Sequence, residues 1–220
     1  MMIVSFGKVI NQLIIDSFAT RLNFQNRNEY IDFYYSLLNK DSDSIFITLD
    51  NKRIDLNKES FFLESLFSFN LNEKANLKYL YKNAEASLTD EENEKFTKIN
   101  ELICQFLSEL YPENKLETIF SERVDFVDLL SLFKYRYLNE CSSLVEYFCS
   151  VLKMMSMLGK TKIVFLNSIL KLFTNEELKI IDEELRHLNL FVIDVDYLKS
   201  TDLSISDTNC FTIDENLFCY

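Results

Sequence analysis

Residues 160–182, KTKIVFLNSILKLFTNEELKIID, decide the fold class of this chain. The apolar run IVFL at 163–166 has the length and composition of a short buried strand. Thr174 followed by Glu177 forms a capping box, which marks the start of a helix. A second β-rich run, LFVIDVD at 190–196, comes after that helix. A strand, a helix and a strand in this order form a βαβ unit, so we expect two parallel strands and an α/β fold.

Asn167 and Ser168 end the first strand, where an ATPase of the P-loop type places an acidic residue that holds magnesium and positions water. A phosphate-binding loop also needs glycines for close backbone approach. The chain contains two glycines, Gly7 and Gly159, so it has no such loop, and the nearest stretch is NLNEKANLKYLYK at 70–82. We therefore expect neither bound nucleotide nor ATP hydrolysis, and we expect Asn167 to hydrogen-bond the turn that follows it. The low glycine content also predicts few turns with positive φ.

A second capping box, Thr89 followed by Glu92, predicts another helix start. Apolar residues follow it at helical spacing, and we expect two or three long amphipathic helices, interrupted near residues 111–116 by Pro112. The stretch SIFITLDNKRIDL at 44–56 predicts a strand, a turn over NKR and a second strand.

These elements predict an α/β head with a small, mostly parallel sheet, formed by residues 1–86 and 159–220. Residues 87–158 are expected to form a long-helix arm inserted between the two parts of the head.

The formal net charge of −12 argues against a nucleic-acid partner, because phosphates are repelled. The apolar run MMIVSFGKVINQLIIDSF at the N-terminus is interrupted by polar residues and has no basic segment before it, so we expect neither a signal peptide nor a membrane span. The five cysteines form no Cys-x-x-Cys pair, which favours reduced thiols and a cytoplasmic location. A single histidine, His187, cannot build a zinc site.

A few basic residues gather in the hairpin turn and in the helical arm, where tyrosines lie between them. Such lysines and arginines could contact the phosphates of a DNA duplex without reading its sequence. The alternative is an ordinary surface of mixed charge. The candidates for DNA binding are Lys52, Arg53, Arg123, Lys134 and Arg136, with Tyr135 and Tyr137 interleaved.

Carboxylates gather just after the expected break in the arm. Calcium prefers such positions, where loop and helix oxygens converge. The alternative is a solvated helix start, because the helix dipole favours acids there without any metal. The acids concerned are Glu117, Glu122, Asp125 and Asp128.

The order of these features resembles the ring-forming accessory protein of type II-A CRISPR loci, the Csn-two family. The resemblance rests most on KTKIVFLNSILKLFTNEEL at 160–178 and on LNLFVIDVD at 188–196. The stretch LETIFSERVDFVDLLSLFKYRYLNECSSLVEYFCSVLKMM at 116–155 is similar to the family's arm, and FITLDNKRIDLNKESFFLESLFSFNLNEKANLKYLYK at 46–82 is similar to its hairpin and following helix. The resemblance covers residues 29–218, and the first 28 residues match poorly.

The resemblance implies a head related to P-loop ATPases that has lost the nucleotide machinery, a helical leg, and a homotetramer that closes into a ring around double-stranded DNA. It implies binding of linear duplex ends without sequence preference, calcium ions that support the ring, and no enzymatic activity. The implied partners are the spacer integrase complex and the RNA-guided effector nuclease, with which the family supports acquisition of new spacers.

Carried onto this sequence, the family's calcium-binding acids fall near Glu117 and Asp128, and a third acid is replaced near Ile119. Its inward-facing basic residues fall near Lys52, Arg53, Lys134 and Arg136. A basic lumen inside an acidic outer surface is compatible with the net charge, since salt screens the outside beyond about 8 to 10 Å. Two other functions stay open: a degenerate P-loop-like protein that still binds nucleotide, and an acidic scaffold that binds only protein.

Overall fold

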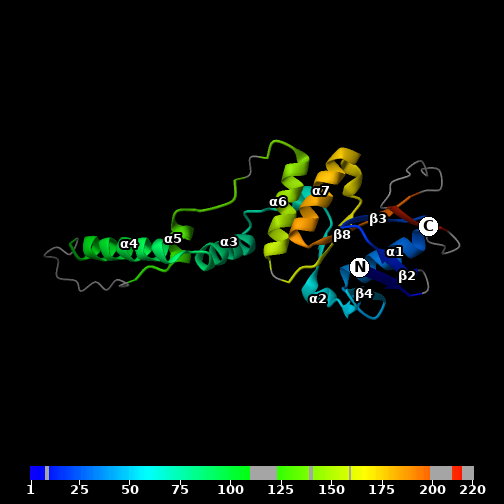
Figure 1. The fold of residues 1–220 in the computed structure, drawn as a ribbon, viewed down its shortest axis with the longest axis horizontal. Helices are drawn as coiled ribbons and strands as arrows, with labels where there is room; N and C mark the ends of the chain where they lie inside the picture. Colours follow the sequence, from blue (N-terminus) through cyan, green and yellow to red (C-terminus); the bar gives the residue numbers. More distant parts are fainter. Residues whose placement is uncertain (8–9, 110–122, 139–140, 159, 199–209, 215–220) are drawn as a thin grey trace. The chain divides into compact units, whose positions relative to one another are not determined.

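The computed structural model describes residues 1–7, 10–109, 123–138, 141–158, 160–198 and 210–214, and Figure 1 shows their helices and strands. The chain divides into two compact units. Unit 1 comprises Met1–Asn70 and Asn139–Tyr220, and unit 2 comprises Leu71–Leu138. These boundaries differ from the expected ones at residues 86 and 158, because helix α3 (Lys74–Ala86) lies in unit 2 and helix α6 (Leu144–Met157) lies in unit 1.

Five parallel strands form the larger sheet of unit 1, in the order β6-β7-β8-β3-β9. The strands are β3 (Ala19–Phe24), β6 (Ser60–Leu63), β7 (Ile163–Asn167), β8 (Phe191–Tyr197) and β9 (Cys210–Ile213). The parallel pairing of β7 with β8 confirms the predicted βαβ unit. The helix between them is α7 (Asn175–Leu188), and its predicted capping box is present, with Thr174 N donating to Glu177 Oε2 at 2.8 Å.

Strand β3 comes from the N-terminal 28 residues, which the family resemblance leaves out. It lies between β8 and β9, with Leu22 opposite both Val195 and Phe211. Its polar residues Thr20 and Asn23 are buried, with exposed fractions of 0% and 5%. Thr20 Oγ1 hydrogen-bonds Ser17 Oγ at 2.8 Å, and Asn23 Nδ2 donates to Cys210 Sγ at 2.7 Å. Because these polar groups have partners, a strand of mixed composition can lie inside the sheet.

Four strands form a second, antiparallel sheet in the order β2-β1-β4-β5. They are β1 (Met2–Phe6), β2 (Ile10–Ile15), β4 (Ile45–Leu49) and β5 (Lys52–Arg53). Strand β4 confirms the first strand predicted at 44–56.

The hairpin after β4 differs from the prediction. Its turn consists of Asp50 and Asn51, whose φ angles are 51° and 63°, so Lys52 and Arg53 lie in β5 and not in the turn. Two residues with positive φ suit a two-residue hairpin. The strand predicted for IDL at 54–56 is wrong, because the Asp55 side chain accepts a hydrogen bond from Asn57 N at 3.0 Å and caps the short helix α2 (Leu56–Glu59).

One hydrophobic core joins both sheets with helix α1 (Arg27–Leu38). Phe33 of α1 is fully buried, and its ring lies 4.9 Å from that of Phe6 and 5.2 Å from that of Phe24. The N-terminal strands therefore supply part of the core of unit 1.

Turns with positive φ are more frequent than the low glycine content predicts. Asparagine and aspartate tolerate this conformation because their short side chains bond locally, and lysine and serine adopt it here as well. The non-glycine residues concerned are Lys40, Asp50, Asn51, Lys134, Ser168 and Asn189. The prediction of few such turns was wrong, because other residues take the role of glycine.

Helix α6 packs in unit 1 and not in the helical arm. The Phe148 ring stacks on that of Phe173 at 5.1 Å, and Lys153 forms an ion pair with Glu184 of α7 at 3.3 Å. The short helices η1 (Leu66–Ser68) and η2 (Leu170–Leu172) complete the helices described in this unit. An amphipathic period shows that a helix has an apolar face, but not which unit that face packs against.

Unit 2 contains α3, α4 (Asp90–Glu109) and α5 (Phe126–Leu132). The capping box predicted at the start of α4 is confirmed, with Thr89 N donating to Glu92 Oε2 at 2.8 Å. The rings of Phe96 and Phe126 join α4 to α5, edge to face, at 5.2 Å. The predicted break near 111–116 lies outside the described residues. None of the described helices combines the length and the apolar character needed to cross a lipid bilayer.

Candidate functional site

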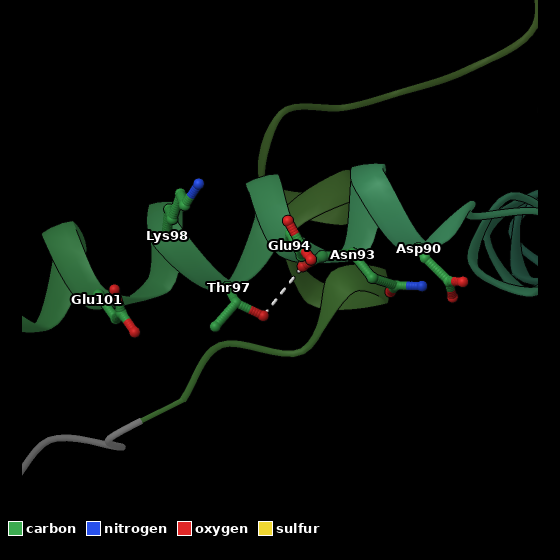
Figure 2. A pocket seen from close by; sticks show the side chains of 6 residues that line it. All are labelled: Asp90, Asn93, Glu94, Thr97, Lys98 and Glu101. Atoms are coloured by element: carbon green, nitrogen blue, oxygen red, sulfur yellow. Dashed lines mark hydrogen bonds between the residues drawn. The ribbon is translucent and has the colours of Figure 1, made fainter.

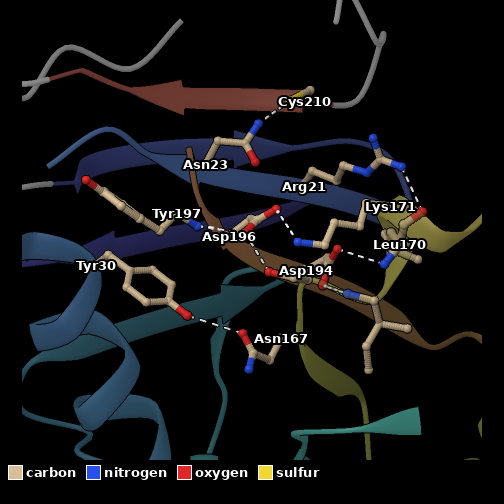
Figure 3. A network of polar contacts seen from close by, with 12 residues as sticks. Arg21, Asn23, Tyr30, Asn167, Leu170, Lys171, Asp194, Asp196, Tyr197 and Cys210 are labelled. Atoms are coloured by element: carbon tan, nitrogen blue, oxygen red, sulfur yellow. Dashed lines mark hydrogen bonds and ion pairs between the residues drawn. The ribbon is translucent and has the colours of Figure 1, made fainter. Parts of the chain in front are cut away.

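Polar side chains gather toward the carboxyl ends of the parallel strands, the edge at which open α/β sheets bind their ligands. Figure 3 shows these side chains and the contacts among them. They come from both halves of unit 1: from β3, α1, β7, η2 and β8. We call this set the carboxyl-edge network and define it as Arg21, Asn23, Tyr30, Asn167, Lys171, Asp194 and Asp196.

Asn167 bonds helix α1 and not the turn that follows it. The Tyr30 hydroxyl donates to Asn167 Oδ1 at 3.2 Å. Burial raises the pKa of Tyr30, so this hydroxyl keeps its proton and remains a donor. The predicted bond from Asn167 to the turn was wrong, because the amides of that turn have another acceptor, Asp194.

Asp194 binds two successive backbone amides of the turn after β7. Its carboxylate accepts from Ile169 N at 2.9 Å and from Leu170 N at 2.8 Å. Ser168, directly before them, has a φ of 55°. Successive amides after a residue in this conformation form a concave anion-binding nest. In this protein a carboxylate of the chain itself lies in the nest.

Asp194 is 1% exposed, and its protonation reflects two opposing effects. Burial raises the pKa of Asp194 to about 6, while the two amide hydrogen bonds act in the opposite direction. Desolvation outweighs the hydrogen bonds, since a carboxylate removed from water loses most of its hydration. Strongly shifted carboxyl groups are common at functional sites, although structural networks also produce them.

The neighbouring groups tie the same turn to β8 and β3. Ser168 Oγ donates to Asp196 Oδ1 at 2.5 Å, and Lys171 Nζ lies 3.5 Å from Asp196 Oδ2. From β3, Arg21 Nη2 donates to Leu170 O at 2.8 Å. The network thus holds the turn between β7 and α7 with bonds from within the chain.

The connection from β3 to α1 leads from a strand into a helix, as the phosphate-binding loop of P-loop proteins does, but it is much shorter than that loop. It consists of Gln25 and Asn26. The Asn26 side chain accepts from Asn28 N at 2.9 Å and from Glu29 N at 3.4 Å, so the chain caps this helix start itself. From the sequence alone, residues 70–82 are the nearest match to a phosphate-binding loop, because strand β3 was not predicted.

In unit 2, two asparagine side chains hold the backbone on either side of α5. Asn100 of α4 accepts from Val124 N at 3.0 Å and donates to Val124 O at 3.1 Å. Asn72 accepts from Tyr137 N at 2.9 Å and donates to Tyr137 O at 3.1 Å. A side-chain amide has one donor and one acceptor group, so it matches the N–H and C=O of one residue. We call residues 123–138, held at both ends in this way, the clamped segment.

The clamped segment contains three of the five basic candidates. Arg123, Lys134 and Arg136 are exposed, and no ion pair involves Lys134 or Arg136 within the described part of the chain. Two aromatic side chains beside them are also exposed, Phe133 by 76% and Tyr135 by 50%. Exposed cations that no carboxylate neutralises suit contact with phosphates.

Lys134 also ends helix α5. Its φ is 52°, its N–H donates to Ser131 O at 3.1 Å, and Tyr135 N donates to Leu130 O at 2.9 Å. These two bonds form a Schellman motif, in which glycine is the usual residue at the position of Lys134. The motif turns the chain out of the helix and into the stretch that Asn72 holds.

The other two basic candidates belong to unit 1. Adjacent residues of a strand point to opposite faces, so the side chains of Lys52 and Arg53 leave β5 on opposite faces of the sheet. The Arg53 guanidinium lies 4.8 Å from the centre of the Phe46 ring and donates to Ser42 O at 2.5 Å. Lys52 is exposed.

The predicted calcium ligands are described only in part. Asp128 is exposed in the first turn of α5, and Asp125 precedes that helix as its N-cap. Glu117 and Glu122 lie outside the described residues. Within the described ranges, no three side chains of histidine, cysteine, aspartate or glutamate come together as a group that could hold a metal ion. Calcium takes six to eight oxygen ligands, so Asp128 could supply only one part of such a site.

A shallow hollow on α4, shown in Figure 2, has the wrong charge for DNA. Three carboxylates and one lysine line it, together with Thr97, whose hydroxyl donates to Asn93 O at 3.0 Å. Phosphates are repelled by such a surface. Its lining residues are Asp90, Asn93, Glu94, Thr97, Lys98 and Glu101.

Several of these residues were not singled out from the sequence. Asp194 and Asp196 had a readable signal, because acids inside an otherwise apolar strand must find partners when buried. Asn72 and Asn100 had none, since each bonds a residue 65 or 24 positions away.

No protein-family model matches this chain, and a search of curated proteins found no match. Among solved structures, the chain is similar to the structure of a bacterial Atm1-family ABC exporter with ATP bound, with a TM-score of 0.39 and 9% sequence identity. The similarity covers 97% of this chain, and the chain spans 36% of the exporter chain. A likeness at this level supports no conclusion about fold or function.

Proposed function

We propose that this chain binds double-stranded DNA without reading its sequence and catalyses no reaction. The observation that carries the proposal is the clamped segment, in which Lys134 and Arg136 are exposed beside Tyr135 while Asn72 holds the backbone of the next residue. Lysines and arginines positioned by a defined backbone can contact the phosphates of any duplex.

The net charge of −12 is compatible with this proposal. Several lysines are neutralised locally by carboxylates, as in the pairs Lys95–Glu91 at 2.6 Å and Lys162–Glu59 at 2.6 Å. Lys134 and Arg136 are not paired in this way among the described residues. Charges farther away than about 8 to 10 Å are screened at physiological salt, so the local cations dominate at contact distance.

We further propose that unit 1 is a P-loop-ATPase-like head that binds no nucleotide. Two features support this reading: Asn26 caps the helix that follows β3, and Asp194 fills the nest that follows β7. A nucleotide phosphate would have to displace a group of the chain at either position. The alternative of a degenerate nucleotide-binding protein is disfavoured for the same reason.

The proposed assembly is a homotetrameric ring around the duplex, as in the Csn-two family. The described part of unit 2 exposes six large leucine, isoleucine or phenylalanine side chains, and the three on α4 recur at helical spacing along one face, which favours a protein interface. These are Ile99, Leu102, Phe106, Leu132, Phe133 and Leu138. A role in spacer acquisition in the cytoplasm, with the integrase complex, the RNA-guided effector nuclease and calcium at Asp128, rests on the resemblance and is part of the proposal.

The first experiment measures binding to a fluorescent linear duplex over a range of salt concentrations. The test variant is Lys134→Gln/Arg136→Gln, and the control, Lys78→Gln/Lys98→Gln, makes the same change in charge on exposed positions of α3 and α4. We expect the test variant to bind about tenfold or more weakly, and the slope of log affinity against log salt to fall by about 2. An equal loss in both variants, or no loss in either, would refute the clamped segment as the DNA contact.

A second experiment tests the ring. Linear and covalently closed circular duplexes of the same sequence are compared with and without calcium, while light scattering gives the mass of the protein. A ring loads onto linear ends and slides off them, and it loads poorly on the closed circle. Equal binding to both forms by a monomer would exclude the ring.

A further inference from the structure

The two edges of the antiparallel sheet are built differently. The edge strand β5 has two residues, both of them basic, whereas the edge strand β2 has six residues, INQLII, with no charge. Proteins protect exposed sheet edges with short strands and charged side chains, because an open edge pairs with other chains. The β5 edge has this protection and the β2 edge lacks it.

Strand β2 is firmly held on its inner side. Leu13 and Ile15 are 6% and 1% exposed, and both lie opposite residues of β1. On the outer face Ile14 is 47% exposed, beside Ile3 of β1. No other described strand pairs with the free edge of β2. The strand therefore presents an ordered, uncharged backbone edge with an apolar side chain next to it.

We propose that β2 pairs in the antiparallel direction with β2 of a second copy of this chain, which joins two four-stranded sheets into one. A two-fold axis brings the same backbone groups of both copies together. The N–H groups of each β2 strand can then donate to the C=O groups of the other. Strand β2 carries no charged residue, so the pairing places no two like charges directly opposite each other within the strand.

The pleat restricts the register of this pairing. Residues that lie opposite each other on paired strands point to the same face of the sheet. The two-fold axis must therefore lie where one residue of β2 is opposite the same residue of the second copy. With Ile14 opposite Ile14 of the second copy, the exposed side chains cover each other, and inward-facing Leu13 lies opposite inward-facing Ile15. Exposed Gln12 then lies opposite Asp16, whose carboxylate can accept from the Gln12 amide.

This inference rests on the sheet alone and not on the proposed DNA binding. A single strand pair buries less than the roughly 1,200 Å² typical of stable interfaces. We therefore expect a weak dimer that dissociates when the protein is diluted.

The test uses the full chain with Ile14→Cys under mild oxidation, followed by mass analysis of the linked peptides. Opposite residues of antiparallel strands have Cβ atoms about 4.5 to 5.5 Å apart, close to the range of a disulfide. Thr48→Cys is the matched control, since Thr48 shares the face with Ile14 but lies two strands farther from the edge. We expect a bond between the two introduced thiols for Ile14→Cys only. Equal linkage in both variants, or none in Ile14→Cys, would overturn the inference.

A second variant, Ile14→Lys, opposes two like charges without crowding a buried site. We expect its self-association, followed by analytical ultracentrifugation, to be about tenfold weaker than that of the wild type, with an unchanged melting temperature. A wild-type chain that stays monomeric, or an Ile14→Lys chain that associates normally, contradicts the pairing. DNA binding is measured on the same samples. A chain that binds DNA but does not pair through β2 contradicts this inference alone, and a chain that pairs but does not bind DNA contradicts the proposed function alone.

Discussion

The side-chain amide of Asn72 forms two hydrogen bonds with the backbone of Tyr137, at 2.9 Å and 3.1 Å, across 65 residues of sequence. Tyr137 directly follows Arg136 and lies three residues after Lys134. Asn72, which carries no charge, therefore holds the backbone directly after Arg136.

Replacing Asn72 with alanine should weaken DNA binding without changing the charge. The backbone N–H and C=O of Tyr137 lose their two hydrogen bonds to Asn72, which costs about 1 to 3 kcal/mol of stability in unit 2. Binding is measured at a temperature where circular dichroism shows both proteins folded. Asn83→Ala, on an exposed position of α3, is the control. Unchanged DNA affinity in Asn72→Ala would show that the clamp does not position the contact.

Lys134→Gly should stabilise the protein and yet weaken DNA binding. Glycine relieves the left-handed backbone at a φ of 52°, by about 1 kcal/mol, and it removes the cation. Lys134→Gln removes the cation without relieving the backbone. We expect a higher melting temperature for the glycine variant only, and the same loss of DNA affinity in both. Normal DNA binding by either variant would exclude Lys134 from the contact.

Asp194 should make the protein more stable as the pH falls through about 6. The pKa of Asp194 is raised from 3.8 to about 6 in the folded protein, so the folded state takes up a proton before the unfolded chain does. Stability from this group is therefore gained between about pH 6 and pH 4 and is absent above that range. The hydrogen bond to Lys162 lowers the pKa of Glu59, so the effect of Glu59 on stability has the opposite dependence on pH. Glu59 is present in both the wild type and Asp194→Asn, so it does not change the difference between them.

The measurement compares the free energy of unfolding of the wild type and of Asp194→Asn by denaturant titration. The asparagine side chain does not titrate. The free energy of unfolding of the wild type minus that of Asp194→Asn should therefore be higher near pH 5 than near pH 7.5, by about 1 kcal/mol. A difference that does not change with pH would show that Asp194 titrates normally in the folded protein.

Asn167→Asp should create no ATPase. The Tyr30 hydroxyl that donates to Asn167 Oδ1 can donate to a carboxylate at the same place, so the fold is retained. The new charge near Asp194 and Asp196 should lower the melting temperature modestly at neutral pH. Phosphate release from ATP is compared with that of the wild type after a melting curve has shown that the variant is folded. Hydrolysis above the wild-type level would overturn the reading of unit 1 as a head without nucleotide chemistry.

Local patterns predicted part of the fold correctly. The capping boxes at Thr89 and Thr174 each involve residues three positions apart, so their chemistry is visible in the sequence. The parallel pairing of β7 with β8 followed from an apolar run on either side of a capped helix. Strand β3 was not predicted, because Arg21 and Asn23 interrupt its apolar pattern and their partners lie far along the chain.

The candidate site shows the same division. The sequence by itself determined the residue types: the cations among tyrosines in the arm, the acids within an apolar strand, and the absence of a glycine-rich loop. Only the tertiary structure decided that Asp194 fills the nest after β7, that Tyr30 bonds Asn167, and that two asparagines clamp the basic segment. The physical reason is that these hydrogen bonds join groups 24 to 137 residues apart, and a contact at that separation depends on how the elements pack and not on any local pattern.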